Sequence, residues 1–377
     1  MDNPQNTDRP TRPNRVCKPI LGTPAGKWNA KVIDALRKAF RKDPELDLTT
    51  HINAHYLKRL RSFKAIRPRL ADWPTDDTRS DDLRLRLDPA HPAEIIRELS
   101  PDLRNELSNY DSLSRAIVEW LLKGNMLYDE PTVTVVQVGQ TAVKITADGK
   151  AVTEHGSLEF LKNNIPCFPA PGARGLVKIG LYSLLFMDFV PGMTLEEAWP
   201  QLDVAGKCAV RDQLDELLSQ LRSLPVPDDA PLGGVQKEGC KDIRRFVYAN
   251  SEPVMNMKQF EDFIFGGSKT ASPIYTRFLR RFMPEGTNRV FTHGDFRPAN
   301  IIVQMKESGG ACTVQGIIDW EASGFYPAYW ESIKATNNFT GREDWDWYEY
   351  LPDSASPHQH ELAWLVDRLW DRSMDNS

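Results

Sequence analysis

The sequence lacks any apolar run of the roughly 18–20 residues that a membrane helix needs, so no membrane span is expected. Its five cysteines lie far apart, and no two have the spacing of metal ligands or of a disulfide framework. We therefore expect reduced thiols and a cytoplasmic protein. With a net charge of −5 the chain has no excess of positive charge, so nucleic acid and membrane surfaces are not expected partners.

What is present is typical of a globular protein, with 377 residues, 41% of them hydrophobic, and room for two domains. Residues 1–27 are polar and proline-rich and predict a disordered tail. Residues 28–124 show helical apolar spacing and predict a helical N-terminal extension. β-branched residues then predict a small sheet with one helix over 125–187, and 188–377 is predicted to be mostly helical.

The stretch FTHGDFRPANIIV carries the strongest chemical signal. Its residues His293, Asp295 and Asn300 form the pattern H-x-D-x-x-x-x-N, and the strands around the following glycine turn predict a hairpin. Asp319 ends the second of these strands and would lie beside Asn300. Asp and Asn oxygens are ligands for Mg²⁺, and a carboxylate beside a hydroxyl orients it and accepts its proton. The pattern therefore indicates phosphoryl transfer from a nucleotide.

A second signal lies upstream of this stretch. AVKI resembles the kinase strand motif V-A-I-K, which makes Lys144 the lysine that contacts the α- and β-phosphates. Glu154 in the next helix is its expected partner, and Glu159 is the alternative. The only glycine shortly before Lys144 is Gly139, so the sequence shows no glycine-rich phosphate loop.

Together, HGDFRPANI and IIDWE resemble the aminoglycoside phosphotransferase and choline kinase-like family, and its fungal-type members look closest. The resemblance covers about Val133 to Glu331, over half of the chain. It implies an α+β, bilobal, protein-kinase-like fold with a small β-sheet lobe and a mostly helical large lobe, preceded here by the helical extension. It also implies an ATP- and Mg²⁺-dependent phosphotransferase that acts on a hydroxyl group of a small molecule.

Carried over by position, the resemblance gives each loop residue a role. Asp295 matches the catalytic base, and His293 matches a histidine that braces the loop. Asn300 and Asp319 match the two magnesium ligands. Arg297 stands two residues after the base, where it either stabilises charge on the transferred phosphate or forms a structural salt bridge.

The same resemblance describes the nucleotide site and its border. Lys144, steadied by Glu154, would fix the phosphates, and the backbone of Met187 to Val190, with Phe189, would meet adenine. Glu321, just after Asp319, is interpreted as a hydrogen-bonded brace.

The acceptor is less well defined by the sequence. Gly341 to Pro352, GREDWDWYEYLP, mixes acids with aromatic residues, which suits a cationic acceptor and equally suits an amphipathic helix with buried tryptophans. A protein kinase is one alternative; Arg297 favours it, but no D-F-G to A-P-E activation segment follows Asp319. A catalytically silent binding module is the other alternative, and the missing glycine loop favours it.

Overall fold

The structure is a computed structural model that describes residues 24–44, 46–47, 52, 56, 82–108, 110–147, 150–242, 248–249, 253–266, 271–286, 288–307, 309–340 and 343–375. The chain divides into two compact units, Met1–Arg79 and Ser80–Ser377, which are described separately. In the first unit, helix α1 spans Pro24–Lys42. The sequence predicted a disordered tail over residues 1–27, so the helix begins before the predicted end of the tail. Proline suits a first helical position because its missing N–H is not needed there. Residues 1–23 of that tail lie outside the described residues.

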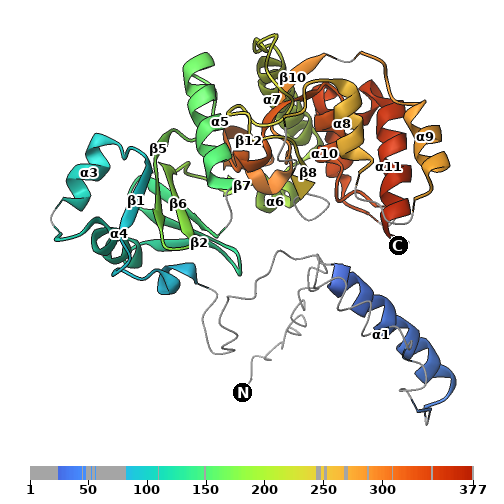
Figure 1. The fold of residues 1–377 in the computed structure, drawn as a ribbon, viewed down its shortest axis with the longest axis horizontal. Coiled ribbons are helices and arrows are strands. Elements are labelled where there is room, and N and C mark those ends of the chain that lie inside the picture. Colours follow the sequence, from blue (N-terminus) through green and yellow to red (C-terminus); the bar gives the residue numbers. More distant parts are fainter. Residues whose placement is uncertain are drawn as a thin grey trace, which may run out of the picture. The chain divides into compact units, whose positions relative to one another are not determined.

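The second unit begins with a six-stranded sheet in the order β1-β5-β6-β4-β3-β2 (Figure 1). Each neighbouring pair runs antiparallel. β1 (Ala93–Arg97) falls within the range that the sequence assigned to a helical extension, so the sheet starts earlier in the chain than predicted. It forms an edge strand, and its sequence AEIIR does not alternate between apolar and polar residues. The other strands are β2 (Asn125–Glu130), β3 (Val133–Val138), β4 (Thr141–Thr146), β5 (Ala173–Ile179) and β6 (Tyr182–Asp188).

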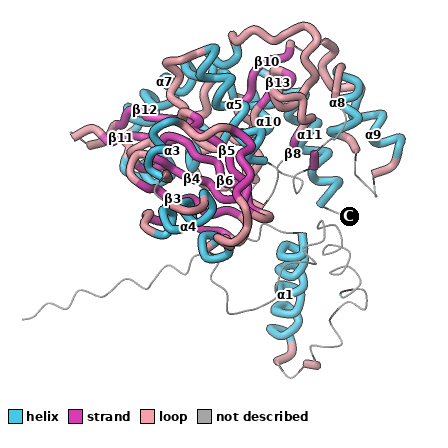
Figure 2. The backbone as a smooth tube through the Cα atoms, turned by 60° about the vertical axis from the view of Figure 1, so that its left-hand side comes forward, coloured by secondary structure: helices cyan, strands magenta, loops and turns pink. Residues whose placement is uncertain are grey.

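Helices α3 (Pro101–Leu107) and α4 (Leu113–Leu122) cover one face of this sheet (Figure 2). Ser112 caps α4, and its hydroxyl accepts a hydrogen bond from an amide of the first turn. Leu121 of α4 and Val143 of β4 are both fully buried in the core between the helices and the sheet. The region before the predicted small lobe therefore supplies the layer that closes the back of the sheet.

The opposite face of the sheet carries a row of side chains that leads to the candidate site. Lys144, in β4, is paired with Val135 of β3 and with Leu185 of β6. Paired residues on antiparallel strands point to the same face, so these three side chains form one row across the sheet. Helix α5 (Lys150–Asn164) brings Glu154 to the lysine in this row.

The rest of the second unit is mostly helical and contains short strand pairs (Figure 1). β10 (Arg289–Thr292) pairs with β13 (Gly324–Pro327), and β11 (Ile301–Met305) pairs with β12 (Cys312–Ile317). The hairpin predicted around the glycine turn is confirmed by the second pair. The remaining elements are β7 (Met193–Thr194), α6 (Leu195–Ala198), η3 (Trp199–Gln201), α7 (Val204–Arg222), β8 (Lys241–Asp242), β9 (Tyr248–Ala249), α8 (Met257–Ile264), α9 (Pro273–Arg280), η5 (Pro298–Asn300), η6 (Trp320–Ala322), α10 (Trp330–Ala335), η7 (Asp346–Tyr350), η8 (Asp353–Ala355), η9 (Pro357–Gln359) and α11 (Glu361–Asp375), with η2 (Leu83–Arg86) before the sheet.

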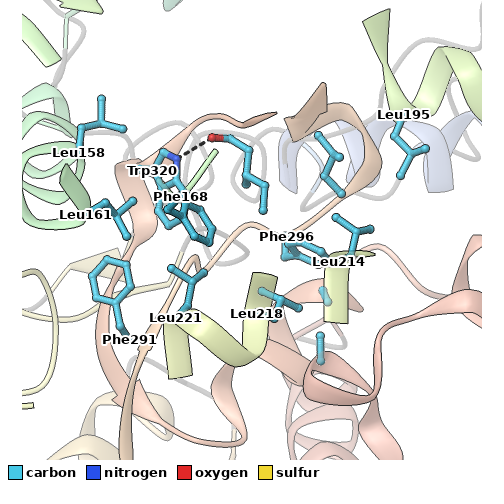
Figure 3. Close-up of a cluster of buried hydrophobic side chains, with 14 of the residues drawn as sticks. Leu158, Leu161, Phe168, Leu195, Leu214, Leu218, Leu221, Phe291, Phe296 and Trp320 are labelled. Carbon is cyan, nitrogen blue, oxygen red and sulfur yellow. Dashed lines mark hydrogen bonds between the residues drawn. The ribbon is translucent and has the colours of Figure 1, made fainter. Parts of the chain in front are cut away.

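A large apolar core lies beneath the stretch that carries the H-x-D pattern (Figure 3). Phe291 and Phe296, on either side of the H-G-D turn, are 1% and 0% exposed. Both belong to the same core as Leu221 of α7 and Trp320, whose indole nitrogen donates to the carbonyl of Ile317 at 2.8 Å. Both ends of the turn are therefore anchored in the interior of the large lobe.

The α+β class, with a sheet lobe followed by a mostly helical lobe, is confirmed. Within the described ranges, no helix combines the length and apolar character required to cross a membrane. Four described cysteines, Cys167, Cys208, Cys240 and Cys312, are free thiols, and Cys17 lies outside the described residues.

Candidate active site

Gly294 sets the path of the loop between β10 and η5. Its φ is +81°, and a Cβ at this position would lie 2.4 Å from the backbone oxygen of Ala322. Any other residue would strain the backbone and push the loop away from η6. The H-G-D turn thus packs directly against the segment that follows Asp319.

His293 and Glu331 hold the start of this loop. The buried carboxylate of Glu331 accepts hydrogen bonds from the amides of His293 at 2.7 Å and Gly294 at 3.2 Å. The Nδ1 atom of His293 accepts from the amide of Asp295 at 3.2 Å, which leaves Nε2 to donate to the carbonyl of Ile318 at 3.0 Å. Burial lowers the pKa of His293, in agreement with this neutral form. The ring therefore joins the loop to the segment that enters Asp319.

Removing the carboxylate of Glu331 is expected to destabilise the protein. Glu331→Ala leaves two buried amides without their acceptor, which should lower the free energy of unfolding by about 2–5 kcal/mol. Glu331→Gln keeps one acceptor oxygen and should lose less. Urea denaturation of the three proteins measures this difference. A loss below about 1 kcal/mol in the alanine variant would show that the loop does not depend on this contact.

Because of His293, the free energy of unfolding should also decrease as the pH falls. Its pKa in the folded protein is lowered, so below about pH 6.5 the unfolded chain takes up a proton that the folded chain does not. The stabilisation is present above that pH and is lost as the pH falls towards the folded-state pKa. His293→Asn removes this group. The difference in unfolding free energy between wild type and variant should shrink from pH 7.5 to pH 5.5, and a constant difference would contradict the argument.

Asp295 is bound by two residues of its own loop. The Nδ2 atom of Asn300 donates to the backbone oxygen and to Oδ2 of Asp295, both at 2.9 Å. Arg297 donates from Nε to the same Oδ2 at 3.2 Å, and its side chain is 45% exposed. Burial raises the pKa of Asp295 to about 6, although Arg297 acts in the opposite direction. Such a carboxylate is a better proton acceptor than an ordinary aspartate and is still mostly ionised at pH 7.

The hairpin brings Asp319 beside Asn300. Ile301 is paired with Ile317, and the amide of Ile318 donates to the carbonyl of Asn300 at 2.9 Å. Asp319 comes next and adopts the left-handed region, with φ 68° and ψ 62°. For a residue other than glycine this conformation costs about 1–3 kcal/mol, so the surrounding contacts hold it there.

Lys144 lies at the centre of a cluster of carboxylates. Its Nζ is 2.8 Å from Glu154, 2.6 Å from Asp319 and 2.9 Å from Glu321. Burial alone would lower the pKa of Lys144, but the three carboxylates outweigh burial and raise it. The lysine is therefore a fixed positive charge that links the sheet, α5 and the end of the hairpin.

The structure distinguishes between Glu154 and Glu159 as the partner of Lys144. Glu154 binds the lysine, and its second oxygen accepts from the amide of Trp320 at 3.2 Å. Burial raises the pKa of Glu154 to about 7, against the attraction of Lys144. Glu159 is half-exposed and instead approaches His155 at 3.5 Å.

The oxygen atoms around this cluster fit a hard divalent cation. Glu154, Asp319 and Glu321 each offer an oxygen within 4.8 Å of the others. Asn300 uses its Nδ2 to bind Asp295, and among the described residues none donates a hydrogen bond to its Oδ1. Carboxylate and amide oxygens of this kind are the ligands that Mg²⁺ accepts, usually with several waters retained.

The segment Met187 to Val190, which the resemblance places against adenine and which we call the hinge, is more constrained than the resemblance implied. Met187 is paired with Ala142 and Ala173 inside the sheet. The amide of Phe189 donates to the carbonyl of Gln140 at 2.9 Å. This amide is therefore already used within the protein, and an adenine ring would have to meet other groups of the hinge.

A small pocket of about 60 Å³ lies beside Asp295. Arg297 borders it from the loop, Glu196 from α6, and Trp345 and Tyr348 from the acid- and aromatic-rich segment. Asp295 lines this pocket, so a small molecule bound there would contact its carboxylate.

The acid- and aromatic-rich segment contributes fewer charges to this pocket than its sequence indicated. Asp346 accepts from the indole nitrogen of Trp199 at 2.7 Å and pairs with Lys207 at 2.5 Å. Trp347 is buried against Trp199, with ring centroids 5.1 Å apart. The buried tryptophan that the second interpretation expected is present as Trp347, in the short 3-10 helix η7. A cationic acceptor stays a prediction, and Trp345 lines the pocket in which it would bind.

Two residues that contact the predicted set were not predicted. Glu331 binds the H-G-D turn; it is the one acid in the buried helix WESIKA, and the sequence carries no signal that links it to the turn. Lys150 donates to Glu321 at 2.8 Å, so Glu321 bridges two lysines. Lys150 opens the helix that follows the lysine strand, and only the fold shows that it turns towards the hairpin.

Comparison with known proteins gives a family match and several structural matches. The model of a phosphotransferase enzyme family matches residues 129–365. No curated protein matches the chain. The structure of aminoglycoside phosphotransferase APH(4)-Ia is 13% identical, with 70% of this chain and 91% of that chain covered and a TM-score of 0.45. The complex of APH(2'')-IIa with streptomycin and ATP is 13% identical, with 70% of this chain and 86% of that chain covered and a TM-score of 0.44. Aminoglycoside-3'-phosphotransferase of type VIII is 15% identical, with 67% of this chain and 93% of that chain covered and a TM-score of 0.43.

Proposed function

The chain belongs to the phosphotransferase enzyme family, and from that premise we propose that it transfers the γ-phosphate of ATP to a hydroxyl group of a small molecule. Its placement among the fungal-type members of the resemblance noted above stays a prediction.

The observation that carries the proposal is the convergence of four residues from three separate segments on one site. Asp295 is bound to Asn300 through two hydrogen bonds of 2.9 Å. The backbone carbonyl of Asn300 accepts a hydrogen bond from the amide of Ile318, the residue before Asp319. The carboxylate of Asp319 lies 2.6 Å from Nζ of Lys144. A base, two oxygen ligands and a phosphate-binding lysine therefore form one connected set, which is what phosphoryl transfer requires.

Within this proposal each residue has one task. Asp295 orients the acceptor hydroxyl and takes its proton at a carboxylate oxygen. Lys144, held by Glu154, binds the α- and β-phosphates, whose oxygens compete with Asp319 and Glu321 for the same ammonium group. A Mg²⁺ ion held in this site would supply positive charge that offsets the charge on the phosphates.

Two further assignments complete this proposal. Asn300 and Asp319 are the residues that would hold Mg²⁺. Arg297 keeps Asp295 ionised in the resting protein and, being half-exposed, has donors left for an incoming phosphate. Most of the catalysis would then come from positioning and from stabilisation of charge.

The acceptor is proposed to bind in the pocket beside Asp295. The aromatic side chains of Trp345 and Tyr348 and the exposed carboxylate of Glu196 support an acceptor that carries an amine as well as hydroxyl groups. Asp346 does not support it, because Lys207 and Trp199 occupy its oxygens.

The segment that follows Asp319 argues against a protein substrate, although Arg297 was noted in its favour. β13 begins at Gly324, soon after Asp319, and α10 follows at Trp330. This connection leaves no room for a long activation segment of the protein-kinase kind.

The proposal is tested by incubating the purified protein with Mg-ATP and a panel of hydroxylated small molecules. The panel contains aminoglycosides such as hygromycin B and streptomycin, amino alcohols, sugars and neutral polyols, with a folded protein substrate as the comparison. Formation of ADP that depends on one acceptor class, together with a phosphorylated product seen by mass spectrometry, supports the proposal. If the protein does not bind ATP and forms no ADP with any acceptor, the proposal is wrong.

A further inference from the structure

The hairpin of β2 and β3 lies where a phosphate-covering turn is needed, and its turn contains no glycine. Val133, at the start of β3, is paired with Thr146, at the end of β4. The turn before Val133 therefore stands at the end of the sheet from which the chain continues into α5. This turn consists of proline and threonine. Gly139, the glycine that the sequence offered, lies in the turn at the opposite end of β3.

A β-bulge in β2 turns one side chain of this hairpin towards the site. Met126 is paired with Val136, and both pack on the helix side of the sheet. After the extra residue Leu127 the register shifts, and Tyr128 is paired with Val135. In a regular strand Met126 and Tyr128 would share the helix side, but the bulge moves Tyr128 to the opposite face.

Tyr128 thereby joins the row that contains Lys144. Tyr128 is paired with Val135, and Val135 is paired with Lys144, so all three side chains lie on one face. Two strand spacings, about 10 Å, separate the backbones of Tyr128 and Lys144. The space between them on this face is where a ligand of the lysine would lie.

The surroundings of Tyr128 are strongly charged. Its side chain is half-exposed, and none of the described residues makes a hydrogen bond to its hydroxyl. Partial burial raises the pKa of this hydroxyl, and the charges of Glu130, Arg297 and Asp319 act on it as well. The hydroxyl thus lies within electrostatic reach of the loop of the large lobe as well as of Lys144.

We propose that Tyr128 is a nucleotide-binding residue whose hydroxyl donates a hydrogen bond to the terminal phosphate of bound ATP. This inference rests on the proposed function and adds a residue to its binding site. The hydroxyl replaces one of the backbone donors that a glycine-rich turn provides, while Lys144 and Arg297 attract the phosphate from either side. The terminal phosphate is the expected contact because Arg297 and Asp319 stand at the transfer end of the site.

The test is equilibrium binding of ATP and ADP to wild type and Tyr128→Phe, measured by calorimetry in EDTA and again with Mg²⁺. Phenylalanine keeps the ring and removes the donor. We expect ATP to bind about 10- to 100-fold more weakly to this variant and ADP to bind within about threefold of wild type. Tyr182→Phe is the matched control, because Tyr182 lies in β6 and packs on the helix side of the same sheet. It should bind both nucleotides as wild type does.

The possible outcomes separate this inference from the proposed function. Unchanged ATP affinity in Tyr128→Phe, with wild type binding ATP, overturns the inference and leaves the proposed function standing. A variant that changes only the KM of the acceptor also overturns it, because Tyr128 would then belong to the acceptor pocket. Absence of ATP binding by wild type removes the proposed function and the inference together.

Discussion

Asp295→Asn is expected to lower kcat by about 10²- to 10⁴-fold while ATP still binds within a few-fold of wild type. The substitution removes the proton acceptor and keeps an oxygen of the same shape, so the hydrogen bond from Asn300 survives. The loss should therefore appear in the chemical step. A steady-state assay of ADP formation, with the acceptor found in the panel, gives kcat, and calorimetry gives the affinity for ATP.

Asp102→Asn is the matched control for this variant. Asp102, in α3, also pairs with an arginine, Arg174, at 2.7 Å, but its side chain is 57% exposed. Loss of that pair should leave kcat unchanged, because exposed pairs contribute little to stability and this one touches no substrate. If Asp295→Asn retains kcat within about threefold, a base at this position is not needed and the mechanism proposed above is wrong.

The second large effect is expected in the ATP affinity of Asp319→Ala. Compared with wild type, this affinity should be weaker with Mg²⁺ and equal or stronger without it. In wild type, Mg²⁺ should tighten ATP binding. Without Asp319 this gain should disappear, with ATP binding in Mg²⁺ weakened by about 100-fold. In EDTA the same variant should bind ATP as well as wild type or better, because a negative charge that competes with phosphate for Lys144 has been removed.

Glu321→Gln separates a metal ligand from a brace. Glu321 binds Lys144 and Lys150 with its two oxygens, so its removal should loosen the lysines and leave the gain from Mg²⁺ in place. Binding isotherms of ATP with Mg²⁺ and with EDTA are needed for all three proteins. If Asp319→Ala keeps the full gain, Asp319 does not hold the metal, and a loss in Glu321→Gln instead would move that role to Glu321.

The spacing of the site was readable from the sequence where one local element sets it. Asp295 and Asn300 belong to one loop, and the register of a short hairpin places Asp319 next to Asn300. Lys144 and Glu154 are ten residues apart in a strand and the helix that follows it, and they meet at 2.8 Å. Such short-range contacts lie within one motif, so the motif and the resemblance it carries were enough to predict them, with Glu159 left as the alternative to Glu154.

Contacts between distant segments were not readable in this way. Glu331 is 38 residues from His293, and no local pattern links a buried acid on a short helix to a turn in a different part of the chain. Asp346 looked like part of an acidic surface, yet it is held by Lys207, 139 residues away. Tyr128 required the pairing register, because a single bulged residue decides which face its ring occupies.

Proximity in sequence was also misleading for Gly139. It stands five residues before Lys144, where a phosphate-binding glycine was sought, but antiparallel pairing returns the chain and leaves it at the other end of the strand. The edge strand β1 was missed for a related reason, since its partner β5 lies about 80 residues further on and its own five residues carry no clear alternation.

The burial of Phe291 and Phe296 on either side of the H-G-D turn has a consequence for how the protein opens. The amides held by Glu331 lie between two anchored rings, so we expect them to exchange with solvent only when the large lobe unfolds. This turn should therefore belong to the most slowly exchanging part of the second unit. The β2 strand, with five of its six residues exposed, lies at the other extreme. Entry and departure of a ligand would then depend on opening of the hairpin of β2 and β3, while the H-G-D turn stays in place.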